Sequence, residues 1–166
     1  MRLFAAITLS EELKKGITST LHDLKKAGVK GSYVPLQNLH VTLAFIGEVK
    51  NAETVKDTLR QVSVKPFRLT LSDMGSFGSE ALYAGVKGNQ GLSGLAKAVR
   101  DALDDAGIDY DRKKFTPHVT LVRRVSGTWK SVPAPKGEMM VKKFSLMKSE
   151  MKDGKRIYTE IFSAGG

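Results

Sequence analysis

Three segments of the chain place apolar residues on one helical face. In the first segment they recur at steps of four, four and three residues, as Leu13, Ile17, Leu21 and Leu24. Ser10 is suited to cap this helix and Gly28 to end it. The same spacing predicts helices from about Asn51 to Val62 and from Leu92 to Ala106.

Apolar-rich or alternating segments between these helices are typical of β-strands. They are an apolar run from Leu3 to Leu9 and residues 39–46, 67–71, 81–86, 118–122, 139–151 and 155–162. The last two flank Asp153-Gly154, a strong hairpin signal. Residues 126–137, with Trp129, are expected to form a loop and a wall of any cleft. The elements recur with similar spacing in the two halves, which indicates a duplicated unit within an α+β fold.

One tetrapeptide occurs in each half. His40-Val41-Thr42-Leu43 and His118-Val119-Thr120-Leu121 are identical and lie 78 positions apart, each at the start of a predicted strand. Side chains of a strand alternate between faces, so His and Thr share one face, about 7 Å apart, with Val and Leu on the other. If the halves face each other, two imidazoles and two hydroxyls meet in one cleft.

These side chains suit acid–base chemistry at phosphorus. An imidazole with an ordinary pKa of about 6.5 can donate or accept a proton near neutral pH, and threonine hydroxyls can donate to phosphoryl oxygens. The repeat offers no third metal ligand, so we expect neither a metal nor another cofactor. The third histidine of the chain, His22, falls on the polar side of the first helix.

Composition narrows the class of protein. The chain has 166 residues, 41% of them hydrophobic, which fits one globular domain spanning residues 1–166. An excess of 27 Lys and Arg over 17 Asp and Glu gives +10 and favours an anionic partner. Cysteine is absent, which excludes disulfides and a thiol nucleophile. Without a targeting pattern or a long apolar segment, we expect a cytoplasmic protein that does not enter membranes.

The paired motifs resemble those of the 2H phosphoesterase superfamily, and more closely the RNA 2′,3′-cyclic phosphodiesterases, also called 2′-5′ RNA ligases. The residues that carry this resemblance are Arg2–Phe4, Asn38–Gly47, Leu82-Tyr83, Phe115–Arg123, Ser149, Gly154 and Tyr158. Departures are mild: Ile46 stands where leucine is common and Val122 where alanine is frequent.

The resemblance implies a bilobal duplicated fold, with two antiparallel sheets facing a central cleft and helices on the outside. It also implies hydrolysis of RNA 2′,3′-cyclic phosphate ends to 2′-phosphates, with reverse 2′-5′ ligation, by a monomer. His40 is assigned as the proton donor and His118 as the proton acceptor, although the sequence leaves the reverse assignment open. Thr42 and Thr120 would hold the phosphate.

Other candidates depend on which face each residue occupies. The family pattern gives Arg123 a role in phosphate binding, yet regular alternation puts both Arg123 and Phe45 opposite the histidines unless a bulge intervenes. Phe45 and Tyr158 are candidates for base stacking, whereas Tyr83 is expected in the core. The clusters Arg112-Lys113-Lys114 and Arg123-Arg124 are expected to flank the cleft.

Two other functions fit the same sequence. One is a non-catalytic, basic RNA-binding module, which would have no need of two imidazoles facing one point. The other is a 2H phosphodiesterase that acts on small cyclic nucleotides. The net charge favours RNA ends over small nucleotides.

Overall fold

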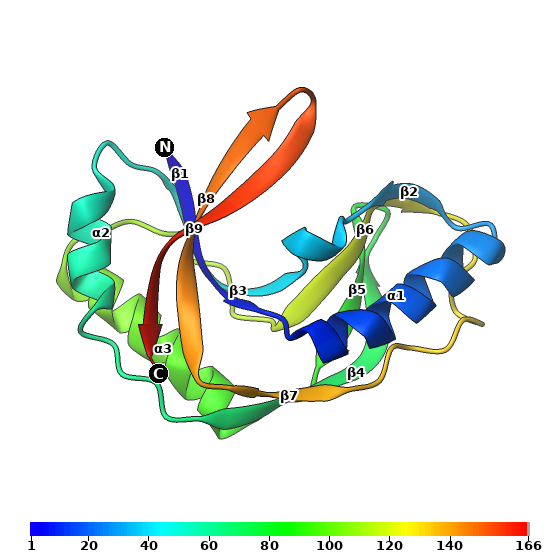
Figure 1. Cartoon of the computed structure of the whole chain (residues 1–166), viewed down its shortest axis with the longest axis horizontal. Coiled ribbons are helices and arrows are strands. Elements are labelled where there is room, and N and C mark those ends of the chain that lie inside the picture. The colour runs from blue at the N-terminus through cyan, green and yellow to red at the C-terminus, as the bar shows by residue number, and fades with distance from the viewer. Residues whose placement is uncertain (166) are drawn as a thin grey trace.

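A computed structural model describes residues 1–165 as a curved sheet of antiparallel strands flanked by helices (Figure 1). The helices are α1 (Glu11–Lys26), α2 (Ala52–Leu59) and α3 (Gln90–Asp105), with a short 3₁₀ helix at Leu36–Asn38. The strands are β1 (Arg2–Thr8), β2 (Lys30–Tyr33), β3 (His40–Glu48), β4 (Phe67–Phe77), β5 (Ala81–Val86), β6 (His118–Ser126), β7 (Glu138–Val141), β8 (Lys143–Lys152) and β9 (Lys155–Gly165). The predicted α+β class is confirmed.

The helices form where the apolar spacing predicts them. The hydroxyl of Ser10 accepts a hydrogen bond from the Leu13 backbone N–H at 3.2 Å, and the apolar face of α1 is buried. Helix α3 begins at the cap Asn89, ahead of the predicted Leu92, and α2 ends at Leu59 rather than Val62. At the other end of the chain, Asp153 (φ 52°) and Gly154 (φ 76°) form the predicted turn between β8 and β9.

The strands pair in the order β7-β4-β5-β6-β3-β1-β8-β9, and β2 pairs with β6. The two expected sheets are therefore joined, because β3 and β6 pair at Val41 and Val119. Each residue of this pair follows a motif histidine, so the two His-x-Thr strands are neighbours in the middle of the sheet.

Both of these strands carry a β-bulge directly after the motif threonine. Opposite β3, Ala6 faces Thr42 and Ala5 faces Ala44, so Leu43 has no partner on β1. Opposite β6, Tyr83 faces Thr120 and Leu82 faces Val122, which skips Leu121 in the same way. Two consecutive buried residues follow each threonine, and the next side chain returns to the face of the histidines.

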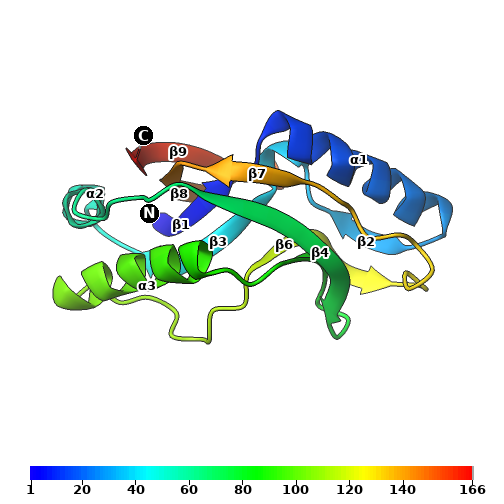
Figure 2. The same ribbon diagram turned by 90° about the horizontal axis from the view of Figure 1, so that it is seen from below.

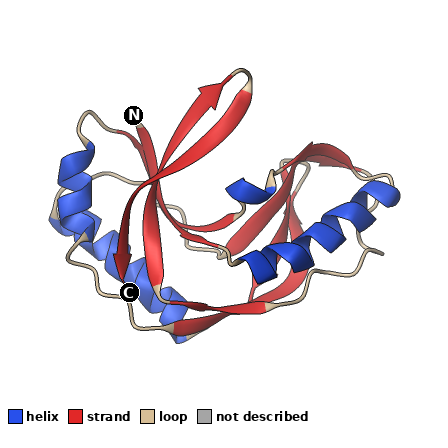
Figure 3. Cartoon of the chain, viewed as in Figure 1, coloured by secondary structure: helices blue, strands red, loops and turns tan. Residues whose placement is uncertain are grey.

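The helices bury the apolar face of the sheet. Helix α2 packs against α3, and α3 packs against β3 and β4, while α1 lies at the other end of the molecule (Figures 2 and 3). A smaller apolar cluster of Phe4, Ala6 and Met147, with Tyr158 against it, lies apart from the main core. The hairpin of β8 and β9 projects beyond the rest of the chain (Figure 1). Within residues 1–165, no helix is long and apolar enough to span a bilayer.

Candidate active site

The paired motifs meet in one cavity of about 630 Å³, called here the central cavity. His40 and Thr42 reach it from β3, and His118 and Thr120 reach it from β6. Burial repeats along the two strands: His and Thr are half-buried while the Val and Leu of each motif are buried. The structure thus brings the four residues together on the face that strand alternation predicts.

Backbone carbonyls fix the orientation of both imidazoles. Nδ1 of His40 lies 2.6 Å from the carbonyl oxygen of Asn38, and Nδ1 of His118 lies 2.6 Å from that of Thr116. A carbonyl only accepts hydrogen bonds, so each Nδ1 carries the proton and donates it. The lone pair of the neutral ring is then on Nε2. In His40, this Nε2 accepts from the hydroxyl of Thr42 at 2.9 Å.

Asn38 has a second role beside His40. It is buried, with 5% of its surface exposed, and its side-chain amide donates to the carbonyl oxygen of Arg156 at 3.0 Å. The residue that orients His40 is therefore itself held by β9, on the projecting hairpin.

The surroundings of His40 disfavour its protonated form. Burial away from water lowers the pKa of His40 to about 4, and the charges of Arg123 and His118 act in the same direction. The hydrogen bond to Asn38 opposes them. His40 is therefore neutral at pH 7 in the free protein.

Each imidazole also contacts two aromatic rings. The ring centroids of Phe4 and Tyr158 lie 5.0 and 5.4 Å from that of His40. Those of Phe77 and Tyr83 lie 5.1 and 5.3 Å from that of His118. The expectation that Tyr83 belongs to the core is wrong, because it is half-buried beside the catalytic candidate His118.

The bulges place Arg123 and Phe45 on the cavity side. Both line the central cavity, and Phe45 is 51% exposed. Both also line a neighbouring cavity of about 510 Å³, called here the side cavity. The objection from regular alternation is thus removed, and the two cavities adjoin, because both are lined by these side chains and by Asp111.

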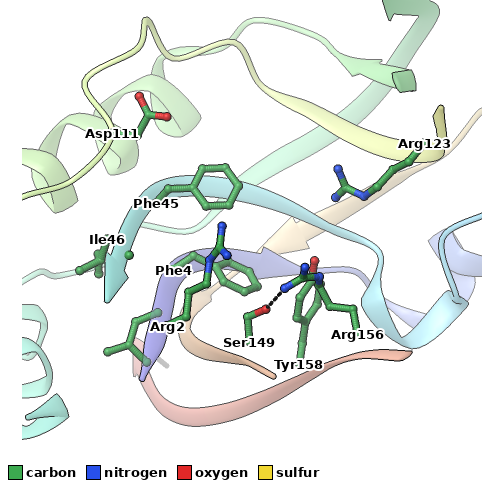
Figure 4. A pocket seen from close by; sticks show the side chains of 11 residues that line it. Arg2, Phe4, Phe45, Ile46, Asp111, Arg123, Ser149, Arg156 and Tyr158 are labelled. Atoms are coloured by element: carbon green, nitrogen blue, oxygen red, sulfur yellow. Dashed lines mark hydrogen bonds between the residues drawn. The ribbon is translucent and has the colours of Figure 1, made fainter. Parts of the chain in front are cut away.

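The side cavity lies beside β1, which contributes Arg2 and Phe4 to its lining (Figure 4). Tyr158, the other stacking candidate, borders it together with Phe4 and Phe45. Arg2 and Arg156 also line it, and the guanidinium of Arg156 donates to the hydroxyl of Ser149 at 2.9 Å.

The prediction that two clusters of basic residues flank the cleft is partly correct. Lys113 and Lys114 line the central cavity. Arg112 instead pairs with Asp104 at 2.7 Å, and Arg124 donates to the hydroxyl of Ser32 at 2.9 Å. The predicted wall formed by residues 126–137 is wrong, because none of them lines either cavity. Trp129 packs against the core, and the carbonyl of Lys136 lies against Gly16 of α1.

The motif repeat gave no signal for Arg100. Its Nε donates to the carbonyl of Leu43 at 3.1 Å, and its Nη1 donates to that of Lys113 at 2.8 Å. Arg100 thus joins α3 to the bulge of β3 and to the loop that carries the cavity lysines. Phe77 was also missed, because β4 continues six residues past its predicted end at Leu71.

Paired His-x-Thr strands around one basic cavity define a phosphoesterase of the 2H class. The chain belongs to the 2′-5′ RNA ligase superfamily, whose profile matches residues 9–153. The resemblance inferred from the motifs is confirmed, and the chain is an enzyme of the hydrolase class.

Two curated relatives match it over nearly their whole length. The RNA 2′,3′-cyclic phosphodiesterase of Escherichia coli is 32% identical, with 96% of this chain and 93% of the relative covered. That of Archaeoglobus fulgidus is 30% identical, with 97% and 98% covered. The crystal structure of Escherichia coli LigT in apo form superposes with a TM-score of 0.82 at 30% identity, covering 99% of this chain and 98% of that one. A LigT complex with 3′-AMP gives a TM-score of 0.79 at 31% identity, covering 98% and 95%.

Proposed function

We propose that this enzyme hydrolyses RNA 2′,3′-cyclic phosphate ends to 2′-phosphates without a metal or cofactor, using His40 and His118 as acid and base. The observation that carries this proposal is the meeting of both His-Thr pairs in the central cavity. The names of the relatives support the same activity. The same ring opening with a 5′-hydroxyl in place of water would form a 2′-5′ linkage, and microscopic reversibility relates this ligation to 2′-5′ cleavage.

In the proposed reaction, Nε2 of His118 removes a proton from water as the water oxygen attacks phosphorus. The bond between phosphorus and the 3′ oxygen breaks, and Nε2 of His40 gives its proton to that oxygen. The phosphate remains on the 2′ oxygen. Thr42, Thr120 and Arg123 donate to the non-bridging oxygens, where negative charge increases in the transition state.

The low pKa of His40 belongs to the free protein. A bound phosphate places negative charge beside the ring and raises the pKa of His40, which favours the protonated form that an acid requires. Protonated Nε2 no longer accepts from Thr42, so the hydroxyl hydrogen of Thr42 is free for a phosphoryl oxygen and Nε2–H is free for the 3′ oxygen.

We propose further that residues 1–166 act as one domain with two pseudo-symmetric lobes, as a monomer in the cytoplasm. The matching burial and matching bulges of β3 and β6 support the duplication.

The test uses an RNA that ends in a 2′,3′-cyclic phosphate, in excess EDTA, with identification of the product isomer. We expect the 2′-phosphate, and we expect His40→Ala and His118→Ala each to lower kcat/KM by about 10²–10⁴-fold. His22→Ala is the matched control, because His22 is exposed on α1.

Loss of turnover in EDTA would contradict the metal-free mechanism. RNA binding without any turnover would favour the non-catalytic module. Turnover limited to cyclic mononucleotides would favour the small-nucleotide enzyme.

A further inference from the structure

The side cavity adds a second binding surface next to the phosphate centre. It lies next to His40, because Phe4 and Tyr158 contact that imidazole and also line this cavity. At about 510 Å³ it falls within the 300–1,000 Å³ range of small-ligand sites. The cleft therefore has room for more than one cyclic phosphate group.

The direction of the reaction decides which part of the substrate occupies this cavity. In an in-line displacement the leaving oxygen lies opposite the attacking water. If His118 activates the water and His40 protonates the 3′ oxygen, the ribose that carries this oxygen is on the His40 side. The terminal nucleoside then enters the side cavity, where Phe45 and Tyr158 offer their rings to its base.

The terminal nucleoside does not account for the positive charge of this cavity, because a nucleoside is uncharged apart from its cyclic phosphate. Arg2, Arg123 and Arg156 line it together with one carboxylate, that of Asp111. Asp111 already accepts a hydrogen bond from the backbone N–H of Lys113 at 3.0 Å. Arg123 also lines the central cavity, where we propose that it binds the reacting phosphate, which leaves the guanidinium groups of Arg2 and Arg156 without an anionic partner within residues 1–165.

Three of the other five arginines differ from these, whereas Arg100 and Arg124 donate to neutral oxygens and likewise form no ion pair within residues 1–165. Arg60, Arg68 and Arg112 each pair with a carboxylate. Within residues 1–165, the three arginines of the side cavity form no such ion pair.

Arg2 on β1 and Arg156 on β9 lie on either side of β8. Arg2 on β1 is opposite Ser149 on β8, and Ser149 in turn accepts from the guanidinium of Arg156 (Figure 4). The backbone of Arg156 is held by Asn38, which also orients His40.

We propose that Arg2 and Arg156 bind the phosphodiester on the 5′ side of the terminal nucleotide. The enzyme would then select oligonucleotide ends over cyclic mononucleotides, because only an oligonucleotide carries this second negative charge. This inference rests on the proposed function and names its substrate class.

The experiment compares three substrates under identical buffer: uridine 2′,3′-cyclic phosphate, the uridine dinucleotide with the same end, and that dinucleotide with an uncharged methylphosphonate linkage. We expect the charged dinucleotide to exceed the mononucleotide in kcat/KM by about tenfold or more, as charge-assisted hydrogen bonds allow. The methylphosphonate should lose most of this advantage, although it keeps both bases.

Arginine variants show which residues cause the preference for the dinucleotide. Arg2→Gln and Arg156→Gln should each reduce the dinucleotide-to-mononucleotide ratio several-fold. Arg60→Gln removes the same charge from α2, outside both cavities, and should preserve the ratio. Equal kcat/KM for the three substrates, or an unchanged ratio in both cavity variants, would overturn the inference while leaving the cyclic phosphodiesterase intact.

A binding measurement separates this inference from the proposed function. Calorimetry with uridine 2′-phosphate and with the dinucleotide 2′-phosphate measures the preference without turnover. Tighter binding of the dinucleotide that is lost in Arg2→Gln and Arg156→Gln would support the subsite even in a protein inactive on every substrate. Equal binding of the two would refute it.

Discussion

At the scale of single residues, the surroundings of His40 decide its protonation state. His40 and His118 donate from Nδ1 to backbone carbonyls at the same distance, and each contacts two aromatic rings. The pKa of His40 is lowered to about 4, chiefly by burial. The ring of His40 is therefore neutral at pH 7 before substrate binds.

NMR titration of the His40 ring measures this lowered pKa. We expect a pKa near 4 in the free protein and a higher pKa with uridine 2′-phosphate bound. Arg123→Gln should also raise the pKa of His40, but not as far as 6.5, because burial is the larger cause. Arg124→Gln is the control, since Arg124 bonds Ser32 instead. A ring that titrates at 6.5 or above in the free protein would contradict this account.

The same pKa shift makes stability depend on pH. His40 is neutral in the folded protein down to about pH 4, whereas the unfolded ring gains its proton near 6.5. The unfolded state thus binds more protons between these values, so stability present above pH 6.5 is lost as the pH falls toward 4. The loss attributable to this group is on the order of 3 kcal/mol.

Urea unfolding at pH 7.5 and pH 4.5 tests this linkage. His40→Gln should reduce the difference between the two free energies of unfolding, while His22→Gln should leave it as in the wild type. An equal difference in the wild type and His40→Gln would show that other groups cause the acid sensitivity.

At the scale of secondary-structure elements, the bulges decide which side chains reach the substrate. Each inserts a residue after the motif threonine and brings Phe45 or Arg123 to the cavity. In β3 the bulge leaves the carbonyl of Leu43 to accept from Nε of Arg100. The guanidinium of Arg100 also packs near Tyr110 and Phe115, with its central carbon 5.6 and 5.7 Å from their ring centroids.

Arg100→Met should therefore disturb the bulge. We expect a loss of about 1–3 kcal/mol in the free energy of unfolding, because the carbonyls of Leu43 and Lys113 lose a charged donor. Turnover should fall as well, since Phe45 and Lys113 lose their support. Chemical denaturation and steady-state kinetics measure the two effects. Arg60→Met, exposed on α2, is the matched control, and equal stability of the two variants would refute this role.

The elements show where sequence reasoning succeeds and where it fails. Helix α1 follows from its own apolar spacing and cap, both of which are local. Strand β2 was missed because Lys30–Tyr33 has little apolar alternation and forms by pairing with β6. Strands β7 and β8 were predicted as one, but the chain leaves β4 at Lys142 and continues beside β1. Such partners are distant in sequence and leave no local pattern.

The site residues also divide into those fixed by a local pattern and those fixed by distant strand pairing. The repeated tetrapeptide identified His40, Thr42, His118 and Thr120, since alternation fixes their common face. The faces of Phe45 and Arg123 depend on bulges set by pairing with β1 and β5, which the sequence does not display.

At the scale of the whole molecule, the excess positive charge acts in two ways. On the proposed function, the net charge of +10 would attract RNA from a distance, whereas the arginines that line the side cavity would contact particular phosphates. The first effect depends on total charge and the second on position. Salt dependence distinguishes them.

The logarithm of kcat/KM should fall with the logarithm of salt concentration for both uridine substrates, but more steeply for the dinucleotide. The expected difference in slope is about 0.7, the value for one further phosphate neutralised on a single strand. Arg60→Gln lowers the net charge without touching the cleft and should preserve this difference. Arg2→Gln lowers the net charge equally and should reduce it. Slopes that change by the same amount in both variants would mean that total charge, and not the arrangement of arginines around the side cavity, governs RNA binding.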